Sequence, residues 1–407
     1  MSYHEREVGK EEELSPIRVA VCSTPWLSVP PESYGGIEAL VYDSLLAYPD
    51  QKIDYFLYTV GETAQRETAS HLSPQIGWVY DKGLYPRIRE ASALTKEAIH
   101  TINFYKDLER RISAGEHFDL VHHHMMFTGT VFALGKRIKL PHLVTVHGPL
   151  EDEFDLEFLK STIGEEGIYF TSISDNQGRH LPELNWVKTV HNGIDVENFP
   201  LKTDKKDFML SVGRIHPDKG QMEAIEVARQ LGKSLVLAGN IDDQQYFDWK
   251  IVPNIDVRAD LMGSAFTAME LTQAVLERAK VPEVIYFGEA NFTDKVWLYQ
   301  NARVFINPLN WEEPFGLVMV EAMACGTPVV SIARGAAPEI VEHGRTGFLV
   351  ADVGEMVERV SEIYQYPNLI RAVDCRKRVE EHFSNRSMAS EYREAYDEVL
   401  RREQLKV

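Results

Sequence analysis

The sequence has few cysteines and no long apolar segment. Its three cysteines, Cys22, Cys325 and Cys375, are far apart and odd in number, so they indicate neither a disulfide framework nor a zinc site and favour a reducing compartment. No apolar run approaches the roughly 18 residues that a membrane-spanning helix needs. Residues 1–14 are rich in Glu and lack the basic and apolar regions of a secretion signal. We therefore expect a soluble, cytoplasmic protein without integral membrane contact.

Positive charge is also scarce. Lys and Arg number 43 against 62 Asp and Glu, which leaves a net charge of −19. This is the wrong sign for electrostatic capture of nucleic acid or anionic lipid, so we expect no nucleic-acid partner. The remaining composition, 44% hydrophobic and 26% charged, is typical of globular proteins. At about 150 residues per domain, a chain of 407 residues predicts two or three domains.

Short apolar segments alternate with longer segments of helical periodicity, which is typical of parallel sheets covered by helices on both faces. Apolar periodicity lapses between residues 198 and 207. The pattern predicts an α/β protein with two doubly wound Rossmann-like domains, 1–198 and 199–384, followed by a C-terminal helix, 385–407. The apolar face of this helix could cover either domain, and we expect it to pack back towards the first. The role of residues 241–280 stays open. Strands are expected at 17–22, 55–60, 120–124, 143–147, 170–173 and 187–191, and in a second series at 208–212, 234–238, 284–287, 304–307 and 329–332.

Ligands of open parallel sheets bind beyond the carboxyl ends of the strands, and three segments there suit a diphosphate. The first contains Gly35 and Gly36 ahead of a helix whose N–H groups would face a phosphate; an ordinary tight turn is the alternative. The second contains Arg214 and Lys219 on either side of one strand-to-helix turn. A guanidinium can hold two phosphate oxygens and an ammonium acts as a point charge. The pair predicts an anion site, with surface salt bridges as the alternative for either residue alone.

The third segment contains two glutamates. Pro314 disfavours helical geometry at Glu313, so Glu313 is expected in a loop, with a helix opening at Gly316 and Leu317 and with Glu321 on its second turn. The two carboxylates would then face one cleft, and each can accept two vicinal hydroxyls, which suits a sugar and a ribose. The alternative is that Glu321 is a buried residue paired with a structural arginine.

These residues resemble a known family. The spacing from Glu313 to Glu321, with PFG between them and EAMACGTPVV around and after Glu321, resembles the Glu-x7-Glu signature of the retaining glycosyltransferases related to glycogen synthase and sucrose synthase, the glycosyltransferase family 4 type. The resemblance implies the GT-B architecture, in which two Rossmann-like domains face each other across a cleft. Further matching segments are YGGIE (34–38), TVHG (145–148), SISDN (172–176), HNGID (191–195), GRIHPDKG (213–220) and RGAAPEIVEHGRTGFLV (334–350).

The resemblance also implies roles for single residues. Arg214 and Lys219 would bind the donor diphosphate, Glu321 the ribose, and Glu313 the sugar ring. Four residues would form the catalytic set: Glu313, His147, Arg214 and Lys219, with His147 near the reactive carbon. The donor-binding set would comprise Gly35, Gly36, Arg214, Lys219, Glu313, Pro314, Phe315, Gly316, Leu317, Val318 and Glu321.

We therefore expect a retaining hexosyltransferase of EC 2.4 type. Its donor would be a nucleoside diphosphate sugar, with UDP-glucose or GDP-mannose favoured by family frequency, and its acceptor a soluble small molecule or saccharide. No cofactor and no metal are expected: His122 and His124 could form a metal pair, but cleft lining or core packing is favoured. Homo-oligomer formation stays open. The alternatives are a catalytically idle sugar-nucleotide binding protein and a sugar-nucleotide epimerase on the same fold.

Overall fold

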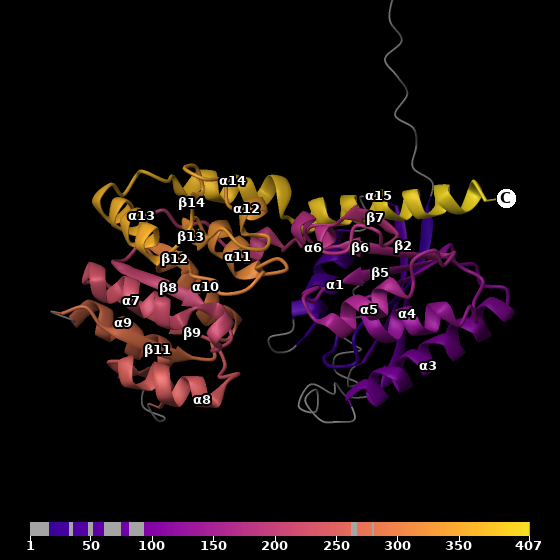
Figure 1. Cartoon of the computed structure of the whole chain (residues 1–407), viewed down its shortest axis with the longest axis horizontal. Coiled ribbons are helices and arrows are strands. Elements are labelled where there is room, and N and C mark those ends of the chain that lie inside the picture. The colour runs from indigo at the N-terminus through magenta and orange to yellow at the C-terminus, as the bar shows by residue number, and fades with distance from the viewer. Residues whose placement is uncertain are drawn as a thin grey trace, which may run out of the picture.

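The computed structural model describes residues 16–31, 36–47, 52–60, 75–80, 93–261, 267–278 and 281–406. Two lobes lie side by side, each built on one parallel sheet with helices around it (Figure 1). The prediction of two doubly wound Rossmann-like units is confirmed.

The first lobe contains a sheet in which the strand order is β3-β2-β1-β4-β5-β6-β7. Its strands are β1 (Ile17–Cys22), β2 (Ile53–Val60), β3 (Gln75–Tyr80), β4 (Leu120–His123), β5 (His142–Val146), β6 (Ile168–Ser172) and β7 (Trp186–Thr189). Its helices are α1 (Gly36–Ala47), α3 (Ala93–Ser113), α4 (Met126–Leu134), α5 (Glu153–Lys160) and α6 (Asp175–Arg179), and a 3-10 turn, η3 (Val196–Asn198), follows β7.

The second lobe contains a sheet of order β10-β11-β9-β8-β12-β13-β14. Its strands are β8 (Phe208–Val212), β9 (Ser234–Ala238), β10 (Val257–Arg258), β11 (Val284–Gly288), β12 (Val304–Asn307), β13 (Val329–Ile332) and β14 (Gly347–Val350). Its helical segments are η4 (Pro217–Lys219), α7 (Gln221–Leu231), α8 (Gln244–Tyr246), η5 (Phe247–Ile251), η6 (Val252–Asn254), η7 (Ala259–Leu261), α9 (Ala268–Arg278), α10 (Phe292–Asn301), α11 (Leu317–Ala324), α12 (Ala337–Ile340), α13 (Val353–Gln365) and α14 (Ala372–His382); α15 (Asn385–Gln404) ends the chain.

Burial on both faces explains why β1 is mostly apolar. Successive side chains of a strand point to opposite faces of the sheet. In β1, Val19 and Val21 join the core formed with α1 and α15, whereas Ala20 and Cys22 join the core formed with α3. Because both faces are covered, the strand is apolar apart from Arg18 near its start, which is ion-paired with Asp54 and Glu116.

Helix α15 follows the second lobe in sequence but lies along the first lobe, as the yellow helix in Figure 1 shows. Ser384 caps its start, because the Ser384 side chain accepts a hydrogen bond from the backbone N–H of Ser387. Met388, Tyr392 and Val399 recur at helical spacing and are buried in the core of the first lobe. The Tyr396 hydroxyl also bonds Nδ1 of His122 on β4 at 2.8 Å.

The chain crosses between the lobes twice, and the two crossing segments are hydrogen-bonded to each other. The Ile194 N–H donates to the Phe383 carbonyl at 3.0 Å, and the Asn385 N–H donates to the Ile194 carbonyl at 2.8 Å. Gly193 lies so close to the second segment that a Cβ there would be 2.2 Å from the Ser384 carbonyl oxygen. The close contact between the crossing segments therefore requires glycine at this position.

Three strands lie outside the segments expected from the sequence: β3, β10 and β14. Strand β10 has only two residues, and all three strands are at sheet edges. An edge strand needs fewer apolar residues than a central one, so its sequence signal is weaker. The expected bounds of the other strands differ from the observed ones by at most two residues.

We predict that Gly193→Ala destabilises the protein by about 1–3 kcal/mol, because the added methyl group has to displace the backbone of the second crossing segment. Urea denaturation measures the change. Gly148→Ala is the matched control, since a Cβ at Gly148 meets nothing within 4 Å. Equal stabilities of the two variants would contradict the claim that the crossing requires glycine.

Candidate functional site

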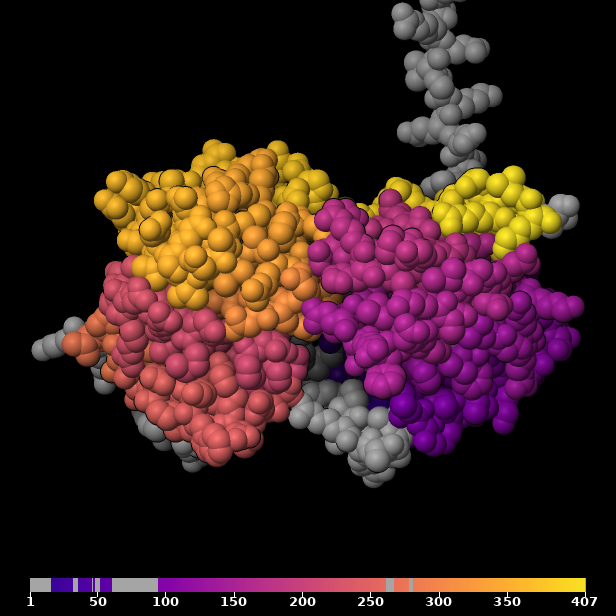
Figure 2. Space-filling view, in the orientation of Figure 1, coloured from indigo at the N-terminus to yellow at the C-terminus, as the bar shows by residue number. Residues whose placement is uncertain are grey.

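A cavity of about 260 Å³ lies between the two lobes. Figure 2 shows the lobes in contact along one side of the molecule and a recess between them. The first lobe contributes the start of α1 and the segments that follow β5, β6 and β7, and the second contributes those that follow β8 and β12. The cavity therefore lies at the carboxyl ends of both sheets, as expected for this fold class. Its lining residues are Gly36, Ile37, Leu40, His147, Pro149, Ile173, Asn192, Val212, Gly213, Arg214, Lys219, Asn307, Trp311, Glu313, Pro314, Phe315, Gly316, Leu317 and Val318.

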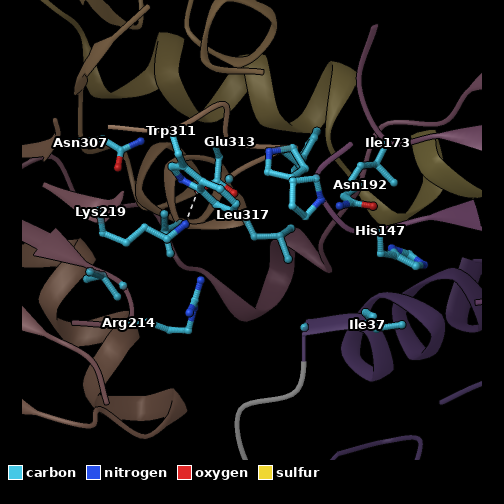
Figure 3. A pocket seen from close by; sticks show the side chains of 18 of the residues that line it. Ile37, His147, Ile173, Asn192, Arg214, Lys219, Asn307, Trp311, Glu313 and Leu317 are labelled. Carbon is cyan, nitrogen blue, oxygen red and sulfur yellow. Dashed lines mark hydrogen bonds and ion pairs between the residues drawn. The ribbon is translucent and has the colours of Figure 1, made fainter. Parts of the chain in front are cut away.

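Lys219 and Glu313 form an ion pair on the second-lobe wall, drawn as a dashed line in Figure 3. Their side chains are only 17% and 12% exposed, so the pair is largely removed from solvent. The Lys219 ammonium also lies 4.3 Å from the centre of the Trp311 ring, at a distance typical of a cation–π contact. Gly220 ends the turn with φ +68°, where a Cβ would be 1.9 Å from the Pro308 carbonyl oxygen. This close approach places Lys219 beside the loop that carries Glu313.

Arg214 lies at the end of β8 and points into the same cavity (Figure 3). Its guanidinium is ion-paired with Asp242, which is almost fully buried. The Gln221 amide donates to the Arg214 carbonyl at 2.8 Å and fixes the backbone at the start of α7. Asp242 belongs to the segment 241–280, whose role the sequence left open. One role of that segment is therefore to hold Arg214.

The segment that precedes α12 is hydrogen-bonded to the loop around Glu313. The Ala336 N–H donates to the Glu313 carbonyl at 2.9 Å, and the Gly335 N–H donates to the Glu312 carboxylate at 2.7 Å. Gly316 then adopts φ +100° and α11 begins at Leu317. The first N–H groups of a helix have no intrahelical partner, so the start of α11 presents hydrogen-bond donors and the positive end of its dipole to the cavity.

Glu321 is not among the described residues that line the cavity. It is buried on α11, where its carboxylate accepts hydrogen bonds from the Lys295 ammonium at 2.7 Å and from the Tyr299 hydroxyl at 2.8 Å. Both partners belong to α10. The structure thus brings Glu313, but not Glu321, into contact with the cavity. The paired, buried arrangement resembles the structural alternative, with lysine and tyrosine in place of arginine.

His147 lies on the opposite wall, in the first lobe (Figure 3). Its Nε2 shares a hydrogen bond of 2.9 Å with Nδ1 of His124. Burial lowers the pKa of His147 to about 4, so the imidazole is neutral at pH 7. Gly36 opens α1 at the same wall, whereas Gly35 lies outside the described residues.

His122 on β4 and His124, which directly follows β4, are both engaged in hydrogen bonds with other side chains. His122 bonds Thr145 at 2.7 Å as well as Tyr396, and His124 bonds His147. Within the described parts of the chain, no group of three or more His, Cys, Asp or Glu is arranged to hold a metal ion. Among the described helices, none combines the length and apolar character that a bilayer crossing requires.

Glu339 of α12 connects the two lobes beside the cavity. Its carboxylate accepts hydrogen bonds of 2.8 Å each from the N–H groups of Asp175 and Asn176, in the first turn of α6. It also accepts a bond of 2.9 Å from Nε2 of His191, and the backbone N–H of His191 donates to Glu391 of α15. Burial alone would lower the pKa of His191, but its hydrogen bonds to Glu339 and Glu391 outweigh this and raise the pKa to about 9. The imidazolium therefore lies between two carboxylates.

Comparison with known proteins identifies the family. Residues 195–381 match the family described as glycosyl transferases group 1, and residues 34–198 match glycosyltransferase family 4. The two matches meet between the lobes and together span most of the chain. The chain is a glycosyltransferase of the GT-B fold.

Two curated relatives illustrate the sequence similarity. N-acetyl-alpha-D-glucosaminyl L-malate synthase of Bacillus anthracis is 25% identical over 308 residues, which span 71% of this chain and 77% of that protein. D-inositol 3-phosphate glycosyltransferase of Mycobacterium bovis is 27% identical over 306 residues, which span 67% of this chain and 57% of that protein.

Solved structures show the same fold at lower identity. Sucrose-phosphate synthase of Thermosynechococcus elongatus superposes with a TM-score of 0.69 at 20% identity, covering 96% of this chain and all of that one. HepE of Anabaena, solved in complex with UDP and glucose, gives a TM-score of 0.63 at 16% identity, covering 94% and 99%.

Several residues of this glycosyltransferase's cavity were not predicted from the sequence. Asn192 and Trp311 lie within motifs that were noted, HNGID and the segment before Glu313, and could have been proposed from those positions. Asp242, which lies outside the cavity lining, carries no such signal, because it meets its partner Arg214 only through the fold. Glu339 lies within the noted segment 334–350, but its partner His191 is distant in the chain, so its role follows only from the fold.

We predict that the His191 junction stabilises this glycosyltransferase at neutral pH and loses this effect in base. The folded-state pKa of about 9 lies above the ordinary value of 6.5, so the stabilisation is fully present below pH 6.5 and is lost as pH rises through about 9. A shift of this size corresponds to at most on the order of 3 kcal/mol. Melting temperatures of the wild type and of His191→Gln should differ most at pH 6 and converge by pH 10. A constant difference across this range would contradict the charge assignment.

We also predict that Glu321→Gln lowers the free energy of unfolding by about 3–5 kcal/mol, because the Lys295 ammonium would then lack its buried counter-charge. The double variant Glu321→Gln/Lys295→Met should recover part of this loss, since it removes both charges. Urea denaturation of the three variants and the wild type tests the pairing. If the single variant is as stable as the wild type, the ion pair has no structural role.

Proposed function

We propose that this glycosyltransferase is a retaining hexosyltransferase that uses a nucleoside diphosphate sugar as donor. The observation that carries the proposal is the second-lobe wall, where Arg214, Lys219 and the start of α11 face one cavity. A guanidinium, an ammonium and the N-terminus of a helix are together suited to a diphosphate. HepE, which has the same fold, is solved with UDP and glucose and with UDP-glucose, in agreement with such a donor. UDP-glucose and GDP-mannose are the donors that we favour.

Each of the two cations is paired with a carboxylate that a bound diphosphate would replace. Lys219 is paired with Glu313 and Arg214 with Asp242. A bound diphosphate would compete for both cations, and Glu313 would then be free to accept hydroxyls of the sugar. The two cations would stabilise the negative charge that develops on the departing diphosphate, which is the step where such charge has the largest effect on rate.

The residues that line the cavity favour attack of the acceptor hydroxyl on the anomeric carbon from the same face as the departing diphosphate. Among its described residues, Glu313 is the only carboxylate, and it lies on the donor side. The first-lobe wall presents the neutral His147 and Asn192 instead of a nucleophilic acid. We propose that the leaving phosphate takes the proton of the acceptor hydroxyl, and that the anomeric configuration is retained.

The acceptor is proposed to be a soluble small molecule or saccharide. The described part of the first-lobe wall carries no side chain that is charged at pH 7, which suits an uncharged polyhydroxylated group. The names of the two curated relatives contain small molecules, L-malate and D-inositol 3-phosphate, which supports the small size of the acceptor; both molecules are anionic, so they do not support its lack of charge. No metal is required in this proposal, because Arg214 and Lys219 supply the positive charge.

We predict that Arg214→Ala and Lys219→Ala each lower turnover by about 100-fold or more, because each removes a charge aimed at the diphosphate. Release of nucleoside diphosphate from a panel of donor sugars, measured in EDTA, gives the rate, and NMR of the product gives its anomeric configuration. Arg229→Ala is the matched control, since Arg229 lies on the same lobe, outside the cavity lining, paired with Asp256. Near-wild-type turnover of the Arg214 and Lys219 variants would refute the donor assignment, and an inverted product would refute the mechanism.

A further inference from the structure

A second cavity, of about 210 Å³, lies in the second lobe, away from the cavity between the lobes. It is bounded by Arg303 and Pro328, which immediately precede β12 and β13, and by the loop that joins α13 to α14 (Figure 1). It therefore opens at the amino ends of the strands, the sheet edge opposite to the proposed donor site. Its lining residues are Thr203, Lys205, Arg303, Gly326, Pro328, Ile363, Pro367, Asn368, Ile370, Arg371, Ala372 and Val373.

The charge of this cavity is opposite to that of the protein. Three of its lining residues, Lys205, Arg303 and Arg371, are cationic and none is acidic, although the chain as a whole carries a net charge of −19. Such a group of cations repels itself unless anions lie nearby. On an acidic protein, this group of three cations therefore indicates either an anionic ligand or a structural role.

Lys205 has a structural role but no counter-ion among the described residues. Its ammonium donates to the carbonyls of Gln300 and Cys325, at 3.0 and 2.9 Å, and to the Thr327 hydroxyl at 2.8 Å. These partners are neutral, so they satisfy its donors without balancing its charge. Burial, with a smaller contribution from the nearby charges of Lys202 and Arg303, lowers the pKa of Lys205 to about 8.

The Arg303 guanidinium has N–H groups that donate to no described residue. The only side-chain hydrogen bond of Arg303 within the described chain is from Nη2 to the Lys205 carbonyl, at 3.2 Å, and its guanidinium forms no ion pair there. Arg371 is ion-paired with Asp374, through Nε at 2.6 Å and Nη2 at 2.8 Å, which orients its guanidinium at the rim. Arg303 is half-buried, and none of its guanidinium nitrogens is among the buried unpaired atoms of the described residues, so its remaining donors are accessible to a ligand in the cavity.

The start of α14 completes the cavity. Ala372 and Val373, the first two residues of this eleven-residue helix, line it, and no side chain caps the helix start. Their N–H groups have no intrahelical partner and lie at the positive end of the helix dipole. Pro328, Ile363 and Ile370 provide an apolar wall beside these donors.

We propose that this cavity is a binding site for a small phosphorylated metabolite, separate from the donor site. The phosphoryl group would lie between Arg303, Arg371 and the start of α14, which combine the guanidinium and helix-terminus contacts that phosphates make in proteins. The apolar wall would contact the carbon body. The volume limits this ligand to about the size of a sugar phosphate.

Isothermal titration with inorganic phosphate and with glucose 1-phosphate, at constant ionic strength, tests the proposal. The titrations use the Arg214→Ala/Lys219→Ala protein, so that the donor site does not contribute. We expect one site, with affinity about tenfold lower in Arg303→Gln and in Arg371→Gln, because each loses a charge-assisted hydrogen bond. Arg345→Gln, an arginine on the same lobe that is paired with Glu342 outside this cavity, is the matched control and should bind as before. Arg371 is 68% exposed, so its variant should fold even if Arg303→Gln does not.

Acylation of Lys205 at pH 8 gives a second readout, by mass spectrometry. A bound phosphate should raise the pKa of this amine and cover it, so its labelling should fall severalfold while that of Lys233, outside the cavity lining, stays constant. Phosphate binding that is equal in all four proteins, no saturable binding at all, or unchanged labelling of Lys205 would each overturn the proposal.

Discussion

The hydrogen-bonded crossing of residues 193–194 with residues 383–385 is the constraint on which the arrangement of the lobes depends. Each lobe has its own sheet. The crossing joins them at two adjacent points and directs α15 onto the first lobe, where Tyr392 and Tyr396 bond Thr145 and His122. The carboxyl ends of the two sheets therefore face each other, and the cavity between them has walls from both lobes.

Three ion pairs beside the cavity share one property: the two partners of each pair come from different loops or from different lobes. Glu313 pairs with Lys219, Asp242 with Arg214, and Glu339 with His191 across the two lobes. Burying a charge is costly unless a counter-charge is near, so these pairs keep polar groups in place at a site that needs them. The second cavity departs from this pattern, because Lys205 and Arg303 form no ion pair within the described chain.

Much of the fold could be predicted because central strands and helices carry a local signal. Strands such as β1, β8 and β12 are buried on both faces and read as apolar runs, so their bounds agree with those expected. Strands β3, β10 and β14 could not be predicted in this way, since edge strands are short or weakly apolar. The sequence also placed Arg214, Lys219 and Glu313 after strands, and the topology brings all three to one wall.

The sequence by itself determined the two doubly wound units and the residue types at their strand ends, because hydrophobic periodicity and loop chemistry are local properties. Only the tertiary structure decided which of those residues meet. The sequence predicts that Glu313 and Glu321 both face one cleft, yet Glu313 faces the cavity and Glu321 is directed into the lobe, where it bonds Lys295 and Tyr299. Ion pairs such as Arg214 with Asp242 join positions far apart in the chain, and their formation depends on how the loops pack rather than on any pattern along the sequence.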